Sequence, residues 1–223
     1  MLPAIFFLAG LPVAFLLDRA IEELSDASWS ANGGLPDEDS VLPWQRGAWP
    51  ARVRHGVALL APALMAVAAT RFDAPQAVAV SVLVVGLLAC TGTDLIRFRV
   101  PNVITYPGTA LALVAALVMP GGDPVAGLAA ALFGGGAFFV MAVITRGGIG
   151  LGDVKLAALI GAGLGLPGAY QALVLGVMAG GLVIFVLFVG RVVTRRQGVP
   201  YAPFLALAAI AVALLNGTSF APL

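Results

Sequence analysis

Long apolar runs separated by short polar turns make up most of the sequence. Eight of these runs approach the roughly 17–25 residues that a helix needs to cross a bilayer. They lie at residues 2–17, 57–70, 76–95, 103–119, 125–144, 154–166, 169–190 and 201–216. The second and sixth runs are short, so the pattern allows six to eight spans. The sequence therefore predicts an all-α fold, a polytopic bundle of about eight transmembrane helices.

The composition supports this interpretation and narrows the function. The 223 residues are 61% hydrophobic and only 10% charged, whereas soluble domains are about 25% charged. The formal net charge is +1, which gives no indication of a nucleic-acid partner. The single cysteine, Cys90, cannot form an intrachain disulfide, and we interpret it as a small apolar filler of its helix.

The basic residues predict how the bundle is oriented. With eight spans and both termini on the non-cytoplasmic side, eleven of the twelve basic residues fall in cytoplasmic loops, and only Arg71 lies outside. Cytoplasmic loops of membrane proteins carry such an excess of Lys and Arg. The eleven are Arg19, Arg46, Arg52, Arg54, Arg97, Arg99, Arg146, Lys155, Arg191, Arg195 and Arg196.

Residues 20–54 form the only long polar segment of the chain. The segment holds six acidic residues and turn signals around Gly33, Gly34 and Pro36. We expect a cytoplasmic loop, partly disordered or loosely folded on the membrane surface. His55, where the second apolar run begins, is expected to be an interfacial residue.

Two carboxylates stand apart from the other acidic residues. Asp94 ends one apolar run and Asp153 begins another, and the predicted topology places both at the cytoplasmic end of the bundle. Ionisable groups at such positions are costly and usually functional. Two neighbouring carboxyl groups would share a proton, so that one activates water while the other polarises a scissile carbonyl.

The residues before Asp153 are rich in glycine. Gly148, Gly150 and Gly152 would leave room for a substrate backbone near the carboxylates and would permit a turn with positive φ. An alternative explanation is structural. Asp153 would then cap its helix, and Asp94 would pair with Arg97 or Arg99.

Three segments carry a resemblance to a known family. They are Asp94 with Val100-Pro101-Asn102, the run Gly150-Leu151-Gly152-Asp153-Val154-Lys155-Leu156, and the run Val199-Pro200-Tyr201-Ala202-Pro203-Phe204-Leu205-Ala206. Together they resemble the type IV prepilin peptidases, membrane aspartic proteases of the G-x-G-D class. The resemblance covers about residues 83–216. It implies that Asp94 and Asp153 are catalytic, and we expect Pro101, Asn102 and Lys155 to contribute to substrate binding.

The resemblance also implies a substrate and a location. The expected substrates are pilin-like precursors with a short basic leader before a hydrophobic helix, cleaved at the cytoplasmic face of the bacterial plasma membrane. Residues 1–55, the first span and the polar loop, occupy the place of the family's cysteine-bearing methylation domain, and residues 56–223 form the peptidase domain. The loop contains no cysteine. We therefore expect a peptidase without a metal or cofactor; S-adenosylmethionine would be needed only if methyltransferase activity survived.

Two other functions remain as alternatives. Ion- or proton-coupled transporters also use membrane carboxylates and helices broken at glycine. They predict carboxylates near the midplane, whereas these aspartates lie at the ends of apolar runs. An inactive relative acting in pilus assembly is the other alternative, and the presence of both aspartates counts against it.

Overall fold

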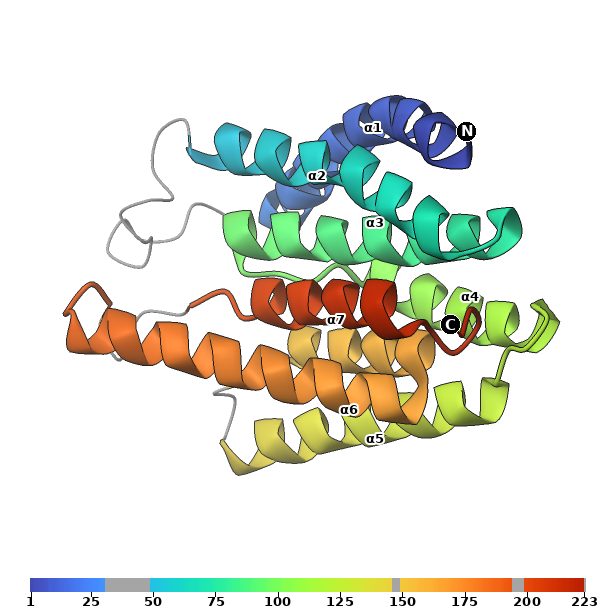
Figure 1. Cartoon of the computed structure of the whole chain (residues 1–223). Helices are drawn as coiled ribbons and strands as arrows, with labels where there is room; N and C mark the ends of the chain where they lie inside the picture. Colours follow the sequence, from blue (N-terminus) through green and yellow to red (C-terminus); the bar gives the residue numbers. More distant parts are fainter. Residues whose placement is uncertain (31–48, 146–148, 194–198, 223) are drawn as a thin grey trace.

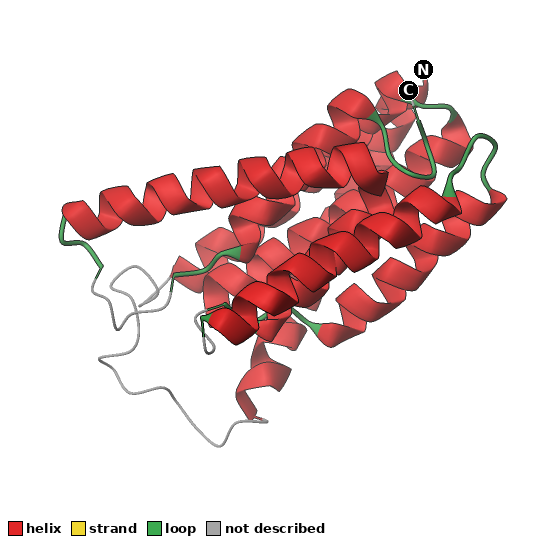
Figure 2. Cartoon of the chain, turned by 90° about the horizontal axis from the view of Figure 1, so that it is seen from below, coloured by secondary structure: helices red, strands yellow, loops and turns green. Residues whose placement is uncertain are grey.

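The computed structural model describes residues 1–30, 49–145, 149–193 and 199–222, and these form an all-α bundle without strands (Figure 1). The predicted all-α class is confirmed for these residues. Both termini lie at one end of the bundle, as the two views agree (Figures 1 and 2). The helices are α1 (Leu2–Ser30), α2 (Trp49–Arg71), α3 (Ala74–Arg97), α4 (Asn102–Val118), α5 (Pro124–Ile144), α6 (Leu151–Val189) and α7 (Ala202–Asn216).

The lengths and composition of these helices fit a membrane protein. Among the described residues, α1, α2, α3, α5 and α6 contain segments long and apolar enough to cross a bilayer, whereas α4 and α7 are shorter apolar helices. The number of spans and the side of the membrane on which each end lies stay predictions.

Helix α6 consists of two helical halves joined by a sharp break. Gly165 has φ 69° and ψ 176°, a left-handed φ that favours glycine. A Cβ on Gly134 of α5 would lie 2.9 Å from both the Ala157 carbonyl oxygen and Leu173 Cδ1. In an unbroken helix these two residues would be about 24 Å apart. The chain therefore doubles back at Gly165, as predicted by the separate runs 154–166 and 169–190 (Figure 1).

The C-terminal segment satisfies the carbonyl groups that this break exposes. Pro167 has no N–H to offer the Gly163 carbonyl, and an unpaired carbonyl in an apolar bundle is costly. The Ser219 N–H donates to Gly163 O at 2.8 Å. The Ser219 hydroxyl donates to Ala162 O at 2.5 Å and contacts Gly163 O at 3.1 Å. The break in α6 is thus stabilised from outside α6.

The prediction of a loop at residues 20–54 is wrong at both ends of this segment, which are helical. Helix α1 continues to Ser30, and α2 begins at Trp49. Leu17, Ile21 and Ser25 are buried, and their spacing of four residues places them on one helix face. The polar part of α1 is therefore an amphipathic extension packed on the bundle. Residues 31–48 lie outside the described residues, so the expectation of a loop there stays a prediction.

The role of Ser219 can be tested by removing its hydroxyl. We expect Ser219→Ala to lower the free energy of unfolding by about 1–3 kcal/mol, because buried carbonyls lose a partner. Thr218→Val is the matched control, since the buried Thr218 hydroxyl has no hydrogen-bond partner among the described residues. Thermal unfolding in detergent measures both. Equal stability of the two variants would contradict the proposed role.

Candidate active site

Asp94 and Asp153 line one pocket at the end of the bundle opposite the termini. Asp94 is in the last turn of α3 and Asp153 in the first turn of α6. The pocket has a volume of about 520 Å³, and the two carboxyl groups are close enough for their charges to repel each other. The structure also brings five other predicted site residues to this pocket, namely Pro101, Asn102, Gly150, Gly152 and Lys155. The remaining one, Gly148, lies outside the described residues.

The carboxylate of Asp94 is held by the beginning of α7. Asp94 is only 6% exposed, and its Oδ2 accepts the Ala202 N–H at 3.0 Å. The Tyr201 N–H also donates to this carboxylate. Because the N-terminus of a helix carries partial positive charge, it stabilises a carboxylate in this place. Tyr201 also lies within reach of the charge of Asp153, so the start of α7 is close to both acids.

Asp153 lies in the first turn of α6 and lines the pocket. Its N–H donates to Gly150 O at 3.0 Å, and its carboxylate accepts the Gly150 N–H in return. Gly150 is the N-cap residue and has no side chain, so the pair resembles only the half of a capping box in which the third helical residue reaches back to the N-cap N–H. Asp153 is therefore not the N-cap residue that the alternative explanation expected, because Gly150 holds that position. The same contacts hold a partly exposed carboxyl group at the pocket wall.

The glycines before Asp153 differ from the prediction. Gly150 has φ −70°, Gly152 lies within α6, and neither has a positive φ, so the expected left-handed turn is wrong at these two positions. A Cβ on Gly152 would lie 3.1 Å from Val100 Cβ. The missing side chain of Gly152 therefore lets the start of α6 pack against the connection between α3 and α4.

Lys155 and Asn102 connect α6 to α4 beside the pocket. The Lys155 ammonium donates to Asn102 Oδ1 at 2.8 Å and lies 5.3 Å from the centre of the Tyr106 ring. A neutral acceptor and an aromatic face leave the positive charge of Lys155 without a neutralising carboxylate in these contacts. Together these residues place a cation on the α4 side of the pocket.

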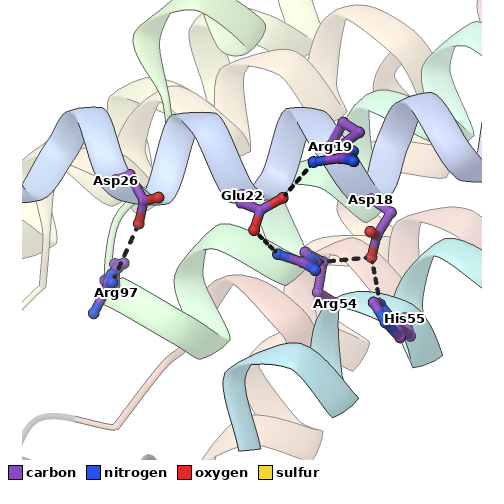
Figure 3. Close-up of polar contacts among 7 residues, drawn as sticks. All are labelled: Asp18, Arg19, Glu22, Asp26, Arg54, His55 and Arg97. Carbon is purple, nitrogen blue, oxygen red and sulfur yellow. Dashed lines mark hydrogen bonds and ion pairs between the residues drawn. The ribbon is translucent and has the colours of Figure 1, made fainter. Parts of the chain in front are cut away.

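The polar extension of α1 also lines the pocket of Asp94 and Asp153, because Leu24 is one of the lining residues. Side chains on this extension are tied to α2 and α3 (Figure 3). The ion pairs are Arg54 with Asp18 at 2.9 Å and with Glu22 at 2.7 Å, Arg97 with Asp26 at 3.5 Å, and Arg19 with Glu22 at 3.4 Å. His55 Nδ1 lies 2.7 Å from Asp18 Oδ1. His55 therefore belongs to the contact between α1 and α2.

The sequence interpretation missed two parts of this site. Leu24 was missed because residues 20–54 were expected to form a loop. The acidic residues Asp18, Glu22 and Asp26 recur every four residues, a helical spacing that could have revealed the extension. The backbone donors of Tyr201 and Ala202 were missed because a sequence motif identifies side chains and not hydrogen-bonding N–H groups.

Comparisons with known proteins agree with the motifs. Residues 81–215, more than half of the chain, match the type IV leader peptidase family. The prepilin leader peptidase/N-methyltransferase of Bacillus subtilis (strain 168) is 34% identical over 163 residues, which are 72% of this chain and 65% of that protein. The protein of the same name from Aeromonas hydrophila is 30% identical over 192 residues, 79% of this chain and 64% of that protein.

The chain thus spans slightly less than two thirds of the length of these curated relatives. No solved structure matches it.

The contact between Gly152 and Val100 gives a prediction for the site. In Gly152→Val, the new side chain pushes the start of α6 away from Val100, and overpacking of this kind costs about 1–3 kcal/mol. Because Asp153 follows directly, we expect the displacement to lower the cleavage rate. Val100→Ala in the same chain should restore part of the rate, since it removes Val100 Cγ2, which would lie 3.2 Å from a Cβ at residue 152. Failure of the double variant to exceed the single one would contradict this packing.

Proposed function

Because the chain belongs to the type IV leader peptidase family, we propose that it is a membrane aspartic endopeptidase. Its substrates are type IV prepilin-like precursors, from which it removes a short basic leader at the cytoplasmic face of the bacterial plasma membrane. The matched relatives, both named prepilin leader peptidase/N-methyltransferase, support this substrate class. Asp94 and Asp153 are the catalytic pair.

The observation that carries the proposal is the shared pocket of the two aspartates. Both lie at helix ends beside the polar connections of the bundle, where a substrate segment outside the apolar core can reach them. A transporter would instead need carboxylates near the middle of its helices. The position of Asp94 and Asp153 at helix ends therefore supports a protease over a coupled transporter.

Hydrolysis in this pocket would follow the two-carboxylate scheme. The ionised member of the pair takes a proton from water as its oxygen attacks the scissile carbonyl carbon, while the protonated member donates a hydrogen bond to the carbonyl oxygen. The C–N bond then breaks as the departing nitrogen takes up the proton that the pair accepted from water, leaving a carboxylic acid, an amine and a pair that again holds one proton. The proton belongs to the pair and to neither residue alone.

We propose peptidase activity alone, without methylation of the new N-terminus. The name of the relatives includes an N-methyltransferase. The resemblance implies a cysteine-bearing methylation domain at residues 1–55, but these residues contain no cysteine, and Cys90, the single cysteine of the sequence, is buried in α3. Mass spectrometry of a cleaved product, made with S-adenosylmethionine present, should show an unmethylated N-terminus. A mass increase of one methyl group would contradict this part of the proposal.

The catalytic assignment is tested by two isosteric substitutions. Asp94→Asn and Asp153→Asn each remove one carboxylate, and we expect each to slow precursor cleavage by at least about 100-fold. Cleavage of a co-expressed precursor is measured by its change in size on immunoblots. The amount of enzyme in the membrane fraction is measured alongside.

Asp123→Asn is the matched control for these variants. Asp123 caps α5 by accepting the Ala126 N–H at 2.9 Å, and asparagine caps helices equally well. This variant should therefore process the precursor at the normal rate. Full processing by either Asp94→Asn or Asp153→Asn would refute the two-aspartate assignment.

A further inference from the structure

A second pocket of the bundle is apolar and lies between α3 and α4. Its volume is about 280 Å³, and hydrophobic residues and glycines line it throughout. Gly86 of α3 and Gly108 of α4 lie in its floor, where a Cβ would approach Ile104 at 3.6 Å and Leu159 at 3.1 Å respectively. Val82 and Leu111, both more than half exposed, form its outer edges. We call this pocket the lateral groove.

The shape of the lateral groove suits a helix in lipid. Small residues let helices approach closely where no hydrophobic effect drives them together. The groove has Ala79, Gly86, Gly108, Ala112 and Ala115 among its lining residues. It extends along α4 from Ile104 to Ala115, a length of about 16 Å, or three helical turns. Phe220 of the C-terminal segment also lines it and is almost completely buried.

The lateral groove shares α3 and α4 with the pocket that Asp94 and Asp153 line, which we call the aspartate pocket. Ile104 at the groove is two residues from Asn102, which lines the aspartate pocket. Along α3, Gly86 precedes Asp94 by eight residues, or about 12 Å of helix. Roughly four extended residues span that distance. A helix seated in the groove would therefore deliver the chain that continues from it to the two carboxylates.

We propose that the lateral groove binds the apolar helix of the precursor whose leader is cleaved. This inference rests on the proposed peptidase function, since it assigns the partner from the chemistry of that substrate. The leader would then occupy the aspartate pocket while the adjoining helix remains in lipid against α3 and α4. Helices α3 and α4 would then position the scissile bond, because both helices line the lateral groove and the aspartate pocket.

Substitutions that fill the lateral groove test this proposal. Gly86→Leu places a side chain in the groove, and Gly136→Leu is the matched control, because Gly136 is exposed on α5 with nothing within 4 Å of its Cβ position. The substrates are a full precursor in phospholipid vesicles and a soluble peptide holding only the leader and cleavage site. For Gly86→Leu we expect KM for the full precursor to rise about tenfold more than KM for the peptide. Gly136→Leu should change neither.

Photocrosslinking tests the occupant without requiring cleavage. A photoreactive amino acid is placed at Val82 or Leu111 at the groove, or at Leu182 of α6 as the control, since all three are exposed. Each is combined with Asp153→Asn so that the precursor stays intact. We expect crosslinks from Val82 and Leu111 to the apolar helix of the precursor, and none from Leu182.

The outcomes separate the groove from the peptidase function. Crosslinks only to lipid or to a second copy of this chain, or equal KM values for Gly86→Leu and Gly136→Leu, would overturn the groove as the precursor site. Groove crosslinks together with cleavage by Asp94→Asn would overturn the aspartate mechanism and leave the groove standing.

Discussion

The candidate site depends on the contact between a buried carboxylate and the start of the last helix. Asp94 lies almost completely inside an apolar bundle, where an unpaired charge or acid group is costly. The N–H of Ala202, 108 residues later in the chain, meets that cost together with the N–H of Tyr201. The contact requires α7 to begin beside the end of α3. It therefore links the position of one aspartate to the packing of the second half of the chain.

The cost of an unpaired polar group in an apolar bundle also explains the hydrogen bonds that Ser219 makes at the break in α6. An apolar bundle leaves no water for exposed carbonyl groups, so a reversal at Gly165 needs a partner from elsewhere. Ser219 supplies that partner with its backbone and its hydroxyl. The first half of α6 presents Asp153 at one end of the bundle, and the second half returns to that end beside α7. Tyr201, at the start of α7, contacts this second half, since its hydroxyl donates to Val177 O at 3.1 Å.

Much of the fold could be predicted because apolar runs and turn residues are local signals. The reversal near Gly165, the start of α4 after Pro101 and the placement of both aspartates at one end of the bundle all follow from them. The extension of α1 gives a weaker local signal, the helical spacing of its acidic residues. Its helix is stabilised by Arg54 and Arg97 on other helices, and by Ile21 packing where Gly92 leaves space, with a Cβ there only 2.6 Å from Ile21 Cδ1. The positive φ expected at Gly150 and Gly152 is absent, and Gly152 instead permits close packing, since a Cβ there would lie 3.1 Å from Val100 Cβ.

The backbone donors at Tyr201 and Ala202 have a consequence for how this site tolerates change. A hydrogen bond from an N–H group survives any substitution that preserves the helix start, so the contact with Asp94 does not depend on the side chain at position 202. Proline is the exception, because it alone removes the donor. A survey of side-chain substitutions at residue 202 would thus record only the limits on volume and polarity set by its complete burial. The contribution of the Ala202 N–H to holding Asp94 would be revealed by replacing the peptide bond between residues 201 and 202 with an ester, which removes this donor.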